Sequence, residues 1–179
     1  MNPWHDFPVG EHPPEIVTAV VEIPRGSRNK YELDKVSGQF RLDRVLFSAV
    51  HYPGDYGFIP RTLHEDNDPL DIIVMINEPT FPGCQIDARP LGVLKMLDRG
   101  EPDDKIIAVP AKDPYYHEYF DIADISQHYL KEVEHFFHIY KDLEGRRVEI
   151  VGWEKSERAV QVVQDSMERY EAKYLRLGP

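Results

Sequence analysis

The sequence of 179 residues contains a single cysteine, Cys84, and no long hydrophobic run. One cysteine excludes an internal disulfide and a zinc site built from several thiolates, so a reducing compartment is expected. No segment approaches the roughly 20 apolar residues of a membrane-spanning helix, and the N-terminal residues lack the apolar core of a secretion signal. We therefore expect a protein that is not exported, has no membrane partner and resides in the cytoplasm.

Positive charge is also scarce, because 21 Lys and Arg residues face 32 Asp and Glu residues, for a net charge of −11. This balance argues against nucleic-acid binding, which depends on a basic surface. A small-barrel module for single-stranded nucleic acid is the non-enzyme alternative, and it would need aromatic platforms in a basic groove. If the substrate is instead an anion, an acidic protein needs cations as intermediaries.

The length suits a single domain, residues 1–179, with one hydrophobic core. Residues 1–14 are rich in proline and predict an extended arm. Short strands followed by amphipathic helices, without βαβ alternation, predict an α+β fold built on a twisted sheet or small closed barrel. Strands are expected at 16–23, 31–33, 40–47, 70–76, 86–96, 106–109 and 148–153, and the two helices over 127–141 and 155–179.

The most informative segment is Asp66-Asn67-Asp68-Pro69-Leu70-Asp71, which places three carboxylates around one proline turn before an apolar run. Carboxylate oxygens are the ligands that Mg²⁺ and Mn²⁺ prefer, and like charges this close repel one another unless a cation or a shared proton neutralises them. Asn and Asp also fill ordinary turns, so this segment alone does not distinguish a metal site from a plain turn. We call residues 66–71 the first acidic turn.

A second acidic turn, residues 98–105, lies between two predicted strands and contains Asp98, Glu101, Asp103 and Asp104. Taken alone, this composition is typical of a solvated hairpin loop. If both turns open on the same side of the barrel, their oxygens suffice for two or more Mg²⁺ ions, which also bind substrate phosphates. Other charged or phenolic side chains near these segments are individually typical of surface or core positions: Glu22, Lys30, Glu32, Arg44, Tyr52, Tyr56, Tyr140 and Lys141.

Taken in order, these motifs resemble the family I soluble inorganic pyrophosphatases of the compact bacterial type, over residues 17–153. The most specific motif is the first acidic turn with Ile72. It is supported by Val21-Glu22-Ile23-Pro24, Lys30-Tyr31-Glu32, Asp43-Arg44, Tyr52-Pro53-Gly54-Asp55-Tyr56-Gly57, Gly92-Val93-Leu94-Lys95-Met96 and the segment His135-Phe136-Phe137 through Tyr140-Lys141-Asp142-Leu143-Glu144.

The resemblance implies a five-stranded OB-like β-barrel with additional strands and two amphipathic helices packed on it. It also implies Mg²⁺-dependent hydrolysis of pyrophosphate to two orthophosphates by direct attack of a metal-activated water or hydroxide. Several Mg²⁺ ions are expected in each active site, and Mn²⁺ or another divalent cation is left open. Members of this type usually assemble as homohexamers through the first helix, which is the self-association expected here.

Roles carried over from the family fall into three groups. The resemblance assigns the tighter metal to Asp66, Asp71 and Asp103, with Asp71 shared by a second ion and with Asp98 and Asp103 holding a further one. It makes Asp68 the base, and Glu22 and Glu32 act mostly through metal-bound waters. Phosphate oxygens are assigned to Lys30, Arg44, Tyr56, Lys105, Tyr140 and Lys141, with Tyr52 nearby.

One rival enzyme class is the aspartyl-phosphate phosphatases, whose nucleophile lies in an Asp-x-Asp motif similar to Asp66-Asn67-Asp68. That motif ordinarily ends an apolar strand, whereas here the apolar run follows it. Trapping of a phosphoenzyme would separate the two classes. A calcium loop of the EF-hand type and a zinc-hydrolase motif both fail on ligand spacing. His135 and His138 share a face of the predicted helix, where a subunit contact or solvent is favoured over a metal.

Overall fold

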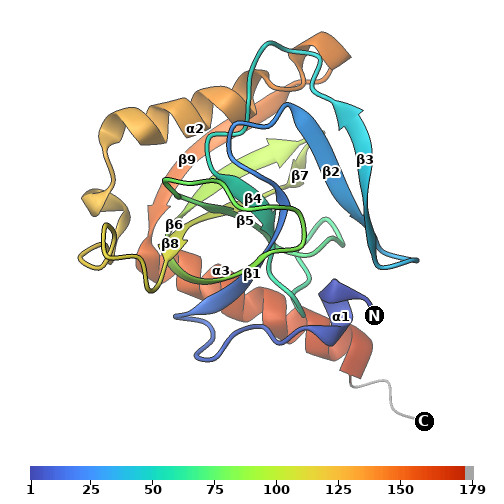
Figure 1. Cartoon of the computed structure of the whole chain (residues 1–179), viewed down its shortest axis with the longest axis vertical. Coiled ribbons are helices and arrows are strands. Elements are labelled where there is room, and N and C mark those ends of the chain that lie inside the picture. Colours follow the sequence, from blue (N-terminus) through green and yellow to red (C-terminus); the bar gives the residue numbers. More distant parts are fainter. Residues whose placement is uncertain (176–179) are drawn as a thin grey trace.

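Five strands close into a ring at the centre of the molecule (Figure 1). They are β1 (Val17–Ile23), β4 (Asp55–Phe58), β5 (Asp71–Val74), β6 (Gln85–Asp98) and β8 (Lys105–Pro110). In this computed structural model, which describes residues 1–175, the strands pair in the order β1–β4–β5–β8–β6, and β6 pairs again with β1. Only the β5–β8 pair is parallel. The ring confirms the predicted five-stranded barrel and the α+β class.

The barrel closes because β6 is long and irregular. Its 14 residues pair with β1, β8, β7 (Glu101–Pro102) and β9 (Val148–Lys155). Register shifts between Pro90 and Gly92, and between Lys95 and Met96, mark bulges, which bend a strand and increase its twist. One strand can therefore serve several neighbours around a small barrel.

A two-stranded hairpin stands beside the barrel, seen at the right of Figure 1. It consists of β2 (Asn29–Asp34) and β3 (Gln39–Val45), and it was predicted at 31–33 and 40–47. Lys30 pairs with Arg44 across the two strands. The hairpin thus brings two predicted phosphate-binding residues together.

Two amphipathic helices cover the barrel, α2 (Gln127–Ile139) and α3 (Ser156–Tyr170), which confirms the predicted pair. Fully burying a large apolar side chain contributes about 1.5–3 kcal/mol, more than the few tenths from a surface helix pair, so packing fixes these helices. Helix α2 buries Leu130, Val133, Phe136 and Phe137, and α3 buries Ala159, Val162 and Val163 against the barrel. Short helical turns are η1 (Ile122–Asp124), η2 (Asp142–Glu144) and η3 (Glu171–Leu175).

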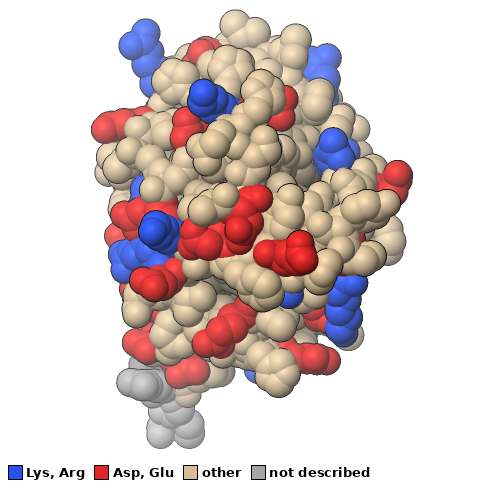
Figure 2. Space-filling model, turned by 90° about the vertical axis from the view of Figure 1, so that its left-hand side faces the viewer, with Lys and Arg blue, Asp and Glu red and all other residues tan. Residues whose placement is uncertain are grey.

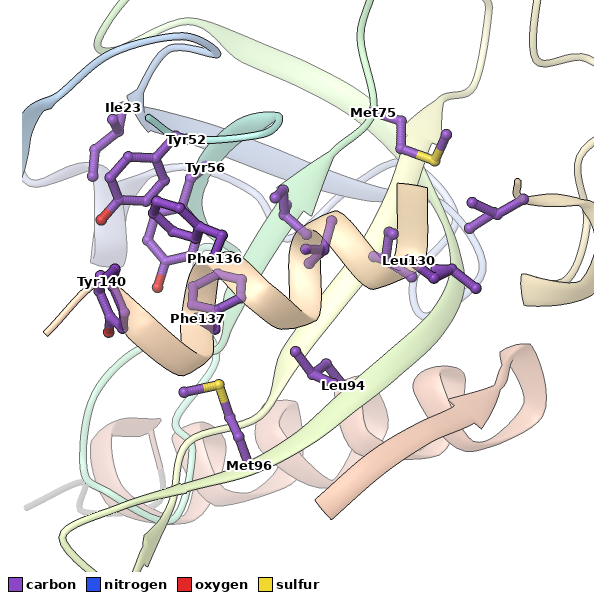
Figure 3. Packing of buried hydrophobic residues seen from close by; sticks show 14 of the residues in the cluster. Ile23, Tyr52, Tyr56, Met75, Leu94, Met96, Leu130, Phe136, Phe137 and Tyr140 are labelled. Atoms are coloured by element: carbon purple, nitrogen blue, oxygen red, sulfur yellow. The ribbon is translucent and has the colours of Figure 1, made fainter. Parts of the chain in front are cut away.

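Aromatic side chains from α2 and the barrel form one end of the main core (Figure 3). The ring centroids of Tyr52 and Phe136 lie 4.6 Å apart, and those of Phe137 and Tyr140 lie 5.6 Å apart. In Figure 3 the hydroxyl groups of Tyr52, Tyr56 and Tyr140 lie at the same end of this cluster. The aromatic core therefore presents phenolic groups on one side.

The N-terminal segment differs from the extended arm predicted for residues 1–14, because it contains the helix α1 (Pro3–Asp6). The Asn2 side chain caps this helix by accepting a hydrogen bond from the Trp4 N–H at 3.0 Å, and Pro3 suits a first helical turn. Of the predicted C-terminal helix over 155–179, residues 176–179 lie outside the described part. The assignment of residues 1–179 to a single domain stays a prediction.

On the face drawn in Figure 2, acidic side chains lie side by side across the middle, and basic side chains form no continuous band. Within residues 1–175, none of the helices has both the length and the apolar character required to cross a bilayer.

Candidate active site

The two acidic turns line one cavity, with a volume of about 390 Å³. Strand β2, the end of β1 and the residues that follow α2 complete its wall. The structure thus brings together side chains that the sequence spreads over more than a hundred positions. The predicted site residues that line the cavity are Glu22, Lys30, Glu32, Tyr56, Asp66, Asp68, Asp71, Asp98, Asp103, Lys105, Tyr140 and Lys141.

Local hydrogen bonds shape the first acidic turn. Asp66 Oδ1 accepts a hydrogen bond from the Asp68 N–H at 3.0 Å, and Asn67 has a positive φ of 68°. Asn and Asp favour such turns because their side chains bond the nearby backbone and tolerate left-handed φ values. The Leu70 N–H donates to Thr62 Oγ1 at 2.9 Å and fastens the end of the turn. The carboxylates therefore project from a fixed loop.

The second acidic turn is a tight hairpin. Arg99 and Gly100, both with positive φ (54° and 78°), form its tip, and Asp98 pairs with Glu101 across it. Two consecutive residues with positive φ suit the right-handed twist of a two-residue hairpin. The Asp103 N–H donates to the Met96 carbonyl at 2.9 Å, which brings Asp103 back beside the end of β6.

Lys105 joins the two turns. Its ammonium donates to Asp103 Oδ1 at 2.5 Å and to Asp71 Oδ2, and its side chain is only 2% exposed. Burial alone lowers the pKa of Lys105, but the charges of Asp103 and Asp71 raise it well above its ordinary value. The same contact lowers the pKa of Asp103 against the effect of burial. Tyr56 adds a hydrogen bond of 2.5 Å to Asp71 Oδ2.

Lys141 pairs with the second acidic turn from the residues that follow α2. Its Nζ lies 2.6 Å from Asp98 Oδ2. Burial lowers the pKa of Lys141, whereas neighbouring Tyr140 and Asp98 raise it to a net value above normal. The other carboxylate oxygen of Asp98, Oδ1, is buried without a hydrogen-bond partner. One oxygen of Asp98 is thus available to a further ligand.

Glu22 and Lys30 form another part of the wall. Burial raises the pKa of Glu22 to about 7, against the hydrogen bond of 2.8 Å that Glu22 Oε1 accepts from the Leu33 N–H, and the charge of Asp71 adds to the rise. Burial and the charge of Arg44 lower the pKa of Lys30, which also forms an ion pair with Glu32. Burial therefore favours the uncharged form of both groups.

The donor set fits hard divalent cations. Burial raises the pKa of Asp66 to about 6, and the charges of Asp71 and Asp103 act in the same direction. Within residues 1–175, no three acidic, histidine or cysteine groups form a ready metal cluster, since Lys105 lies between acids of the two turns. The acids offer only oxygen ligands, and their negative charge exceeds the positive charge of the lysines around them. A divalent cation would supply the missing positive charge and a partner for the free Oδ1 of Asp98.

Two predicted residues do not line the cavity. Arg44 lies beside it on β3, where its guanidinium pairs with Asp43 and with Glu144, with Nε 2.8 Å from Glu144 Oε1. Tyr52 is buried behind Tyr56, with ring centroids 5.2 Å apart. The structure therefore places Arg44 at the margin and Tyr52 in the supporting layer.

Other charged residues also line the cavity: Arg99 and Glu101 belong to the second acidic turn but had no assigned role, and Lys35 and Arg146 were not predicted from the sequence. Lys35 is the most informative, because its ammonium pairs with Asp68. Lys30 and Glu32 alternate along β2, but Lys35 follows the end of that strand in a turn, so alternation does not extend to it. No signal in the sequence marked Lys35 as a cavity residue.

Comparison with known proteins gives consistent matches. The family model described as "Inorganic pyrophosphatase" matches residues 19–171. An inorganic pyrophosphatase of Geobacillus stearothermophilus is 53% identical over 87% of this chain and 94% of its own length. One from Haloferax volcanii is 49% identical over 97% of this chain and 99% of its own length. The crystal structure of the inorganic pyrophosphatase from Thermus thermophilus superposes with a TM-score of 0.92, with 43% identity over 96% of this chain and 99% of the other.

Proposed function

Because the chain belongs to the inorganic pyrophosphatase family, we propose that this cavity is its active site, where pyrophosphate is hydrolysed to two orthophosphates by direct attack of water. The resemblance noted in the sequence is confirmed, and the enzyme is an inorganic diphosphatase. The observation that carries the location of the site is the meeting of both acidic turns with Lys30, Lys105 and Lys141 around one cavity. A polyanion needs this combination of cation-binding oxygens and ammonium groups.

The family is metal-dependent, and we propose Mg²⁺ as the cation. Asp66, Asp71 and Asp103 would hold one ion, shared through Asp71 with a second, and Asp98 with Asp103 would hold a further one. A divalent cation held there neutralises phosphate charge and lowers the pKa of water. Mg²⁺ suits the site because it prefers a few carboxylate ligands together with substrate phosphates.

Lysine and tyrosine side chains would bind the phosphate groups. Lys30, Lys105 and Lys141 supply ammonium groups from three different parts of the chain: β2, β8 and the residues that follow α2. Burial raises the pKa of Tyr56 well above normal and also raises the pKa of Tyr140, so both phenols stay protonated and donate hydrogen bonds at neutral pH. Arg44, at the margin, is close enough to Lys30 through the β2–β3 pairing to serve the same phosphate.

Asp68 would act as the base. Its own N–H donates to Asp66 Oδ1, which fixes the turn, and its side chain is 56% exposed, so water reaches it. Asp68 takes the proton of the attacking water, while Lys30 and Arg44 stabilise the charge that develops on the leaving phosphate. Glu22 and Glu32, from β1 and β2, would orient solvent in the same cavity. The reaction needs no covalent intermediate.

Phosphate release tests this function. We expect release from pyrophosphate with Mg²⁺, little from ATP or a phosphomonoester, and none with a chelator. Hydrolysis of the phosphomonoester in preference to pyrophosphate would contradict the proposal. Acid quenching with labelled pyrophosphate should trap no phosphoenzyme, and a trapped aspartyl phosphate would favour the rival phosphatase class.

We also propose self-association, as a homohexamer, in the cytoplasm and without nucleic-acid or membrane partners. The proposal follows the resemblance to compact bacterial members of this family, which usually form hexamers. Phe47, Phe81, Tyr115 and Leu143 are large apolar side chains exposed on the described surface, where a subunit contact would cover them. Sedimentation velocity should give a species of six chains. A monomer at micromolar concentration would contradict the hexamer.

A further inference from the structure

The N-terminal residues lie directly against the turn of the β2–β3 hairpin. Asn2 Nδ2 donates a hydrogen bond to the Lys35 carbonyl at 2.8 Å. At Gly38, a Cβ atom would lie 2.3 Å from the Met1 carbonyl oxygen, so the chain passes closer there than a side chain allows. The position of this turn is therefore tied to residues 1–6, which we call the N-terminal clasp.

The clasp is fastened at its other side to the residues that lead into the first acidic turn. Trp4 Nε1 donates to the Thr62 carbonyl at 2.8 Å, and the Arg61 N–H donates to the Trp4 carbonyl at 2.8 Å. Thr62 in turn accepts the hydrogen bond from the Leu70 N–H at the end of that turn. One short segment thus contacts both the hairpin turn and the support of the acidic turn.

Helix α3 also packs against the clasp, through Tyr170. Trp4 is only 4% exposed and packs in a cluster with Leu33, Phe58 and Tyr170. His5 Nδ1 lies 2.7 Å from the Tyr170 hydroxyl. Because Leu33 belongs to β2 and Phe58 to β4, this packing fixes the clasp relative to both the hairpin and the barrel.

Lys35 is the side chain that the clasp brings to the cavity. Its ammonium pairs with Asp68 and lies 5.7 Å from the centre of the Trp4 ring. Its side chain is 43% exposed, whereas the side chains of Lys30, Lys105 and Lys141 are 14%, 2% and 11% exposed. Of these four lysines, Lys35 is the one whose head group can change partners at low cost.

We propose that Lys35 is an additional substrate-binding residue, which contacts a phosphate group of pyrophosphate at the cavity mouth, and that the N-terminal clasp positions it. The inference rests on the proposed function. Before substrate binds, Lys35 is paired with Asp68. A phosphate group carries more charge than one carboxylate and draws the ammonium to itself, and Asp68 is thereby released to accept the proton of water. Substrate binding and readiness of the base are coupled through one side chain.

The first test compares Lys35→Met with Lys112→Met, whose ion pair with Asp87 is exposed and lies outside the cavity. Loss of one charge-assisted hydrogen bond should raise the KM for pyrophosphate about tenfold, with kcat changed by less than about threefold. Calorimetry with methylenediphosphonate, which is not hydrolysed, should show a similar loss of affinity. The Lys112 variant should match the wild type in both measurements. An unchanged KM and unchanged analogue affinity in Lys35→Met would overturn the proposal.

The second test is a double-mutant cycle between Lys35 and the clasp. Trp4→Leu keeps apolar packing but removes the indole ring and its N–H, and it should raise KM about threefold in the wild-type background and not at all beside Lys35→Met. Asn2→Ala, which deletes the contact to the Lys35 carbonyl, should show the same dependence in a smaller effect. An equal rise in KM in both backgrounds would contradict the positioning of Lys35 by the clasp, and the clasp would then be only structural. This conclusion does not depend on any change in Tm.

The two hypotheses fail differently. A wild-type enzyme that does not hydrolyse pyrophosphate overturns the proposed function. A wild-type enzyme that hydrolyses it, with Lys35→Met equal in KM and analogue affinity, overturns only the role of Lys35.

Discussion

Replacing Lys105 with methionine should destabilise the metal-free protein, because carboxylates of the two acidic turns then repel each other. Lys105 is 2% exposed, and the carboxylates that it contacts, Asp71 and Asp103, are 24% and 15% exposed. Methionine is of similar length, so the substitution deletes the ammonium group without leaving a large cavity. In metal-free protein the two acids then keep their positions near each other without the cation between them.

The expected magnitude follows from the burial. Breaking a buried ion pair by removing one partner costs about 3–5 kcal/mol. For a chain of this size each kcal/mol shifts Tm by about 2–4 °C, so the metal-free variant should melt about 6–20 °C below the wild type. Added Mg²⁺ should narrow that gap, because the acids of the variant bind the cation without competition from Lys105.

Thermal unfolding followed by circular dichroism, in chelator and in a Mg²⁺ series, measures both effects. Lys112→Met is the matched control, since the side chain of Lys112 is 80% exposed and its loss should leave Tm unchanged. A Lys105→Met variant that melts with the wild type in chelator would refute the reasoning. A difference in Tm between wild type and variant that added Mg²⁺ does not reduce would also refute it.

Further predictions concern the base, the barrel and the acidic wall. Asp68→Asn should keep the fold and cation binding but lose most turnover at neutral pH, since an amide is not basic; steady-state rates beside a Mn²⁺ titration check this, and near wild-type turnover would exclude Asp68 as the base. Gly57→Ala should lower the free energy of unfolding by at least about 1–3 kcal/mol, because its Cβ would lie 1.9 Å from the Val20 carbonyl oxygen; an unchanged urea midpoint would contradict the close approach of β1 and β4. The pKa of Glu22 rises from 4.5 to about 7 on folding, so its contribution to stability is present below pH 4.5 and is lost as pH rises through 7. Metal-free protein should therefore lose about 2 kcal/mol from this group between pH 5.5 and 8.5, and Glu22→Gln should remove that part of the slope in urea unfolding; an identical pH dependence in the two proteins would speak against the shift.

Much of the barrel was predictable, because apolar and β-branched runs mark strands such as β1, β6 and β8 in the sequence itself. Strand β4 was not predicted, because Asp55 and Gly57 are poor strand formers. Gly57 is there for a tertiary reason, the close passage of β1, which local propensity does not encode. Helix α1 was missed for another reason: its four residues are too few to show a helical pattern, and the burial of Trp4 against distant segments cannot be seen locally.

The part of the candidate site that local sequence predicts is the acidic residues of the two turns. Carboxylates at Asp66, Asp71 and Asp98 stand in sequences that favour turns, so their exposure toward a common cavity needed only the right topology. The cavity position of Lys35 depends instead on contacts with Asn2 and Trp4, which lie 33 and 31 residues earlier in the chain, and it could not be predicted from the hairpin alone.

The central claim is that acids of both turns bind divalent cations together in one cavity, and calorimetric titration with Mn²⁺ tests it most directly. Asp71→Asn in the first turn and Asp98→Asn in the second should each weaken binding at least about tenfold, which is about 1.4 kcal/mol. Asp87→Asn, outside the cavity, should bind as the wild type does. Wild-type affinity in either turn variant would contradict a shared site.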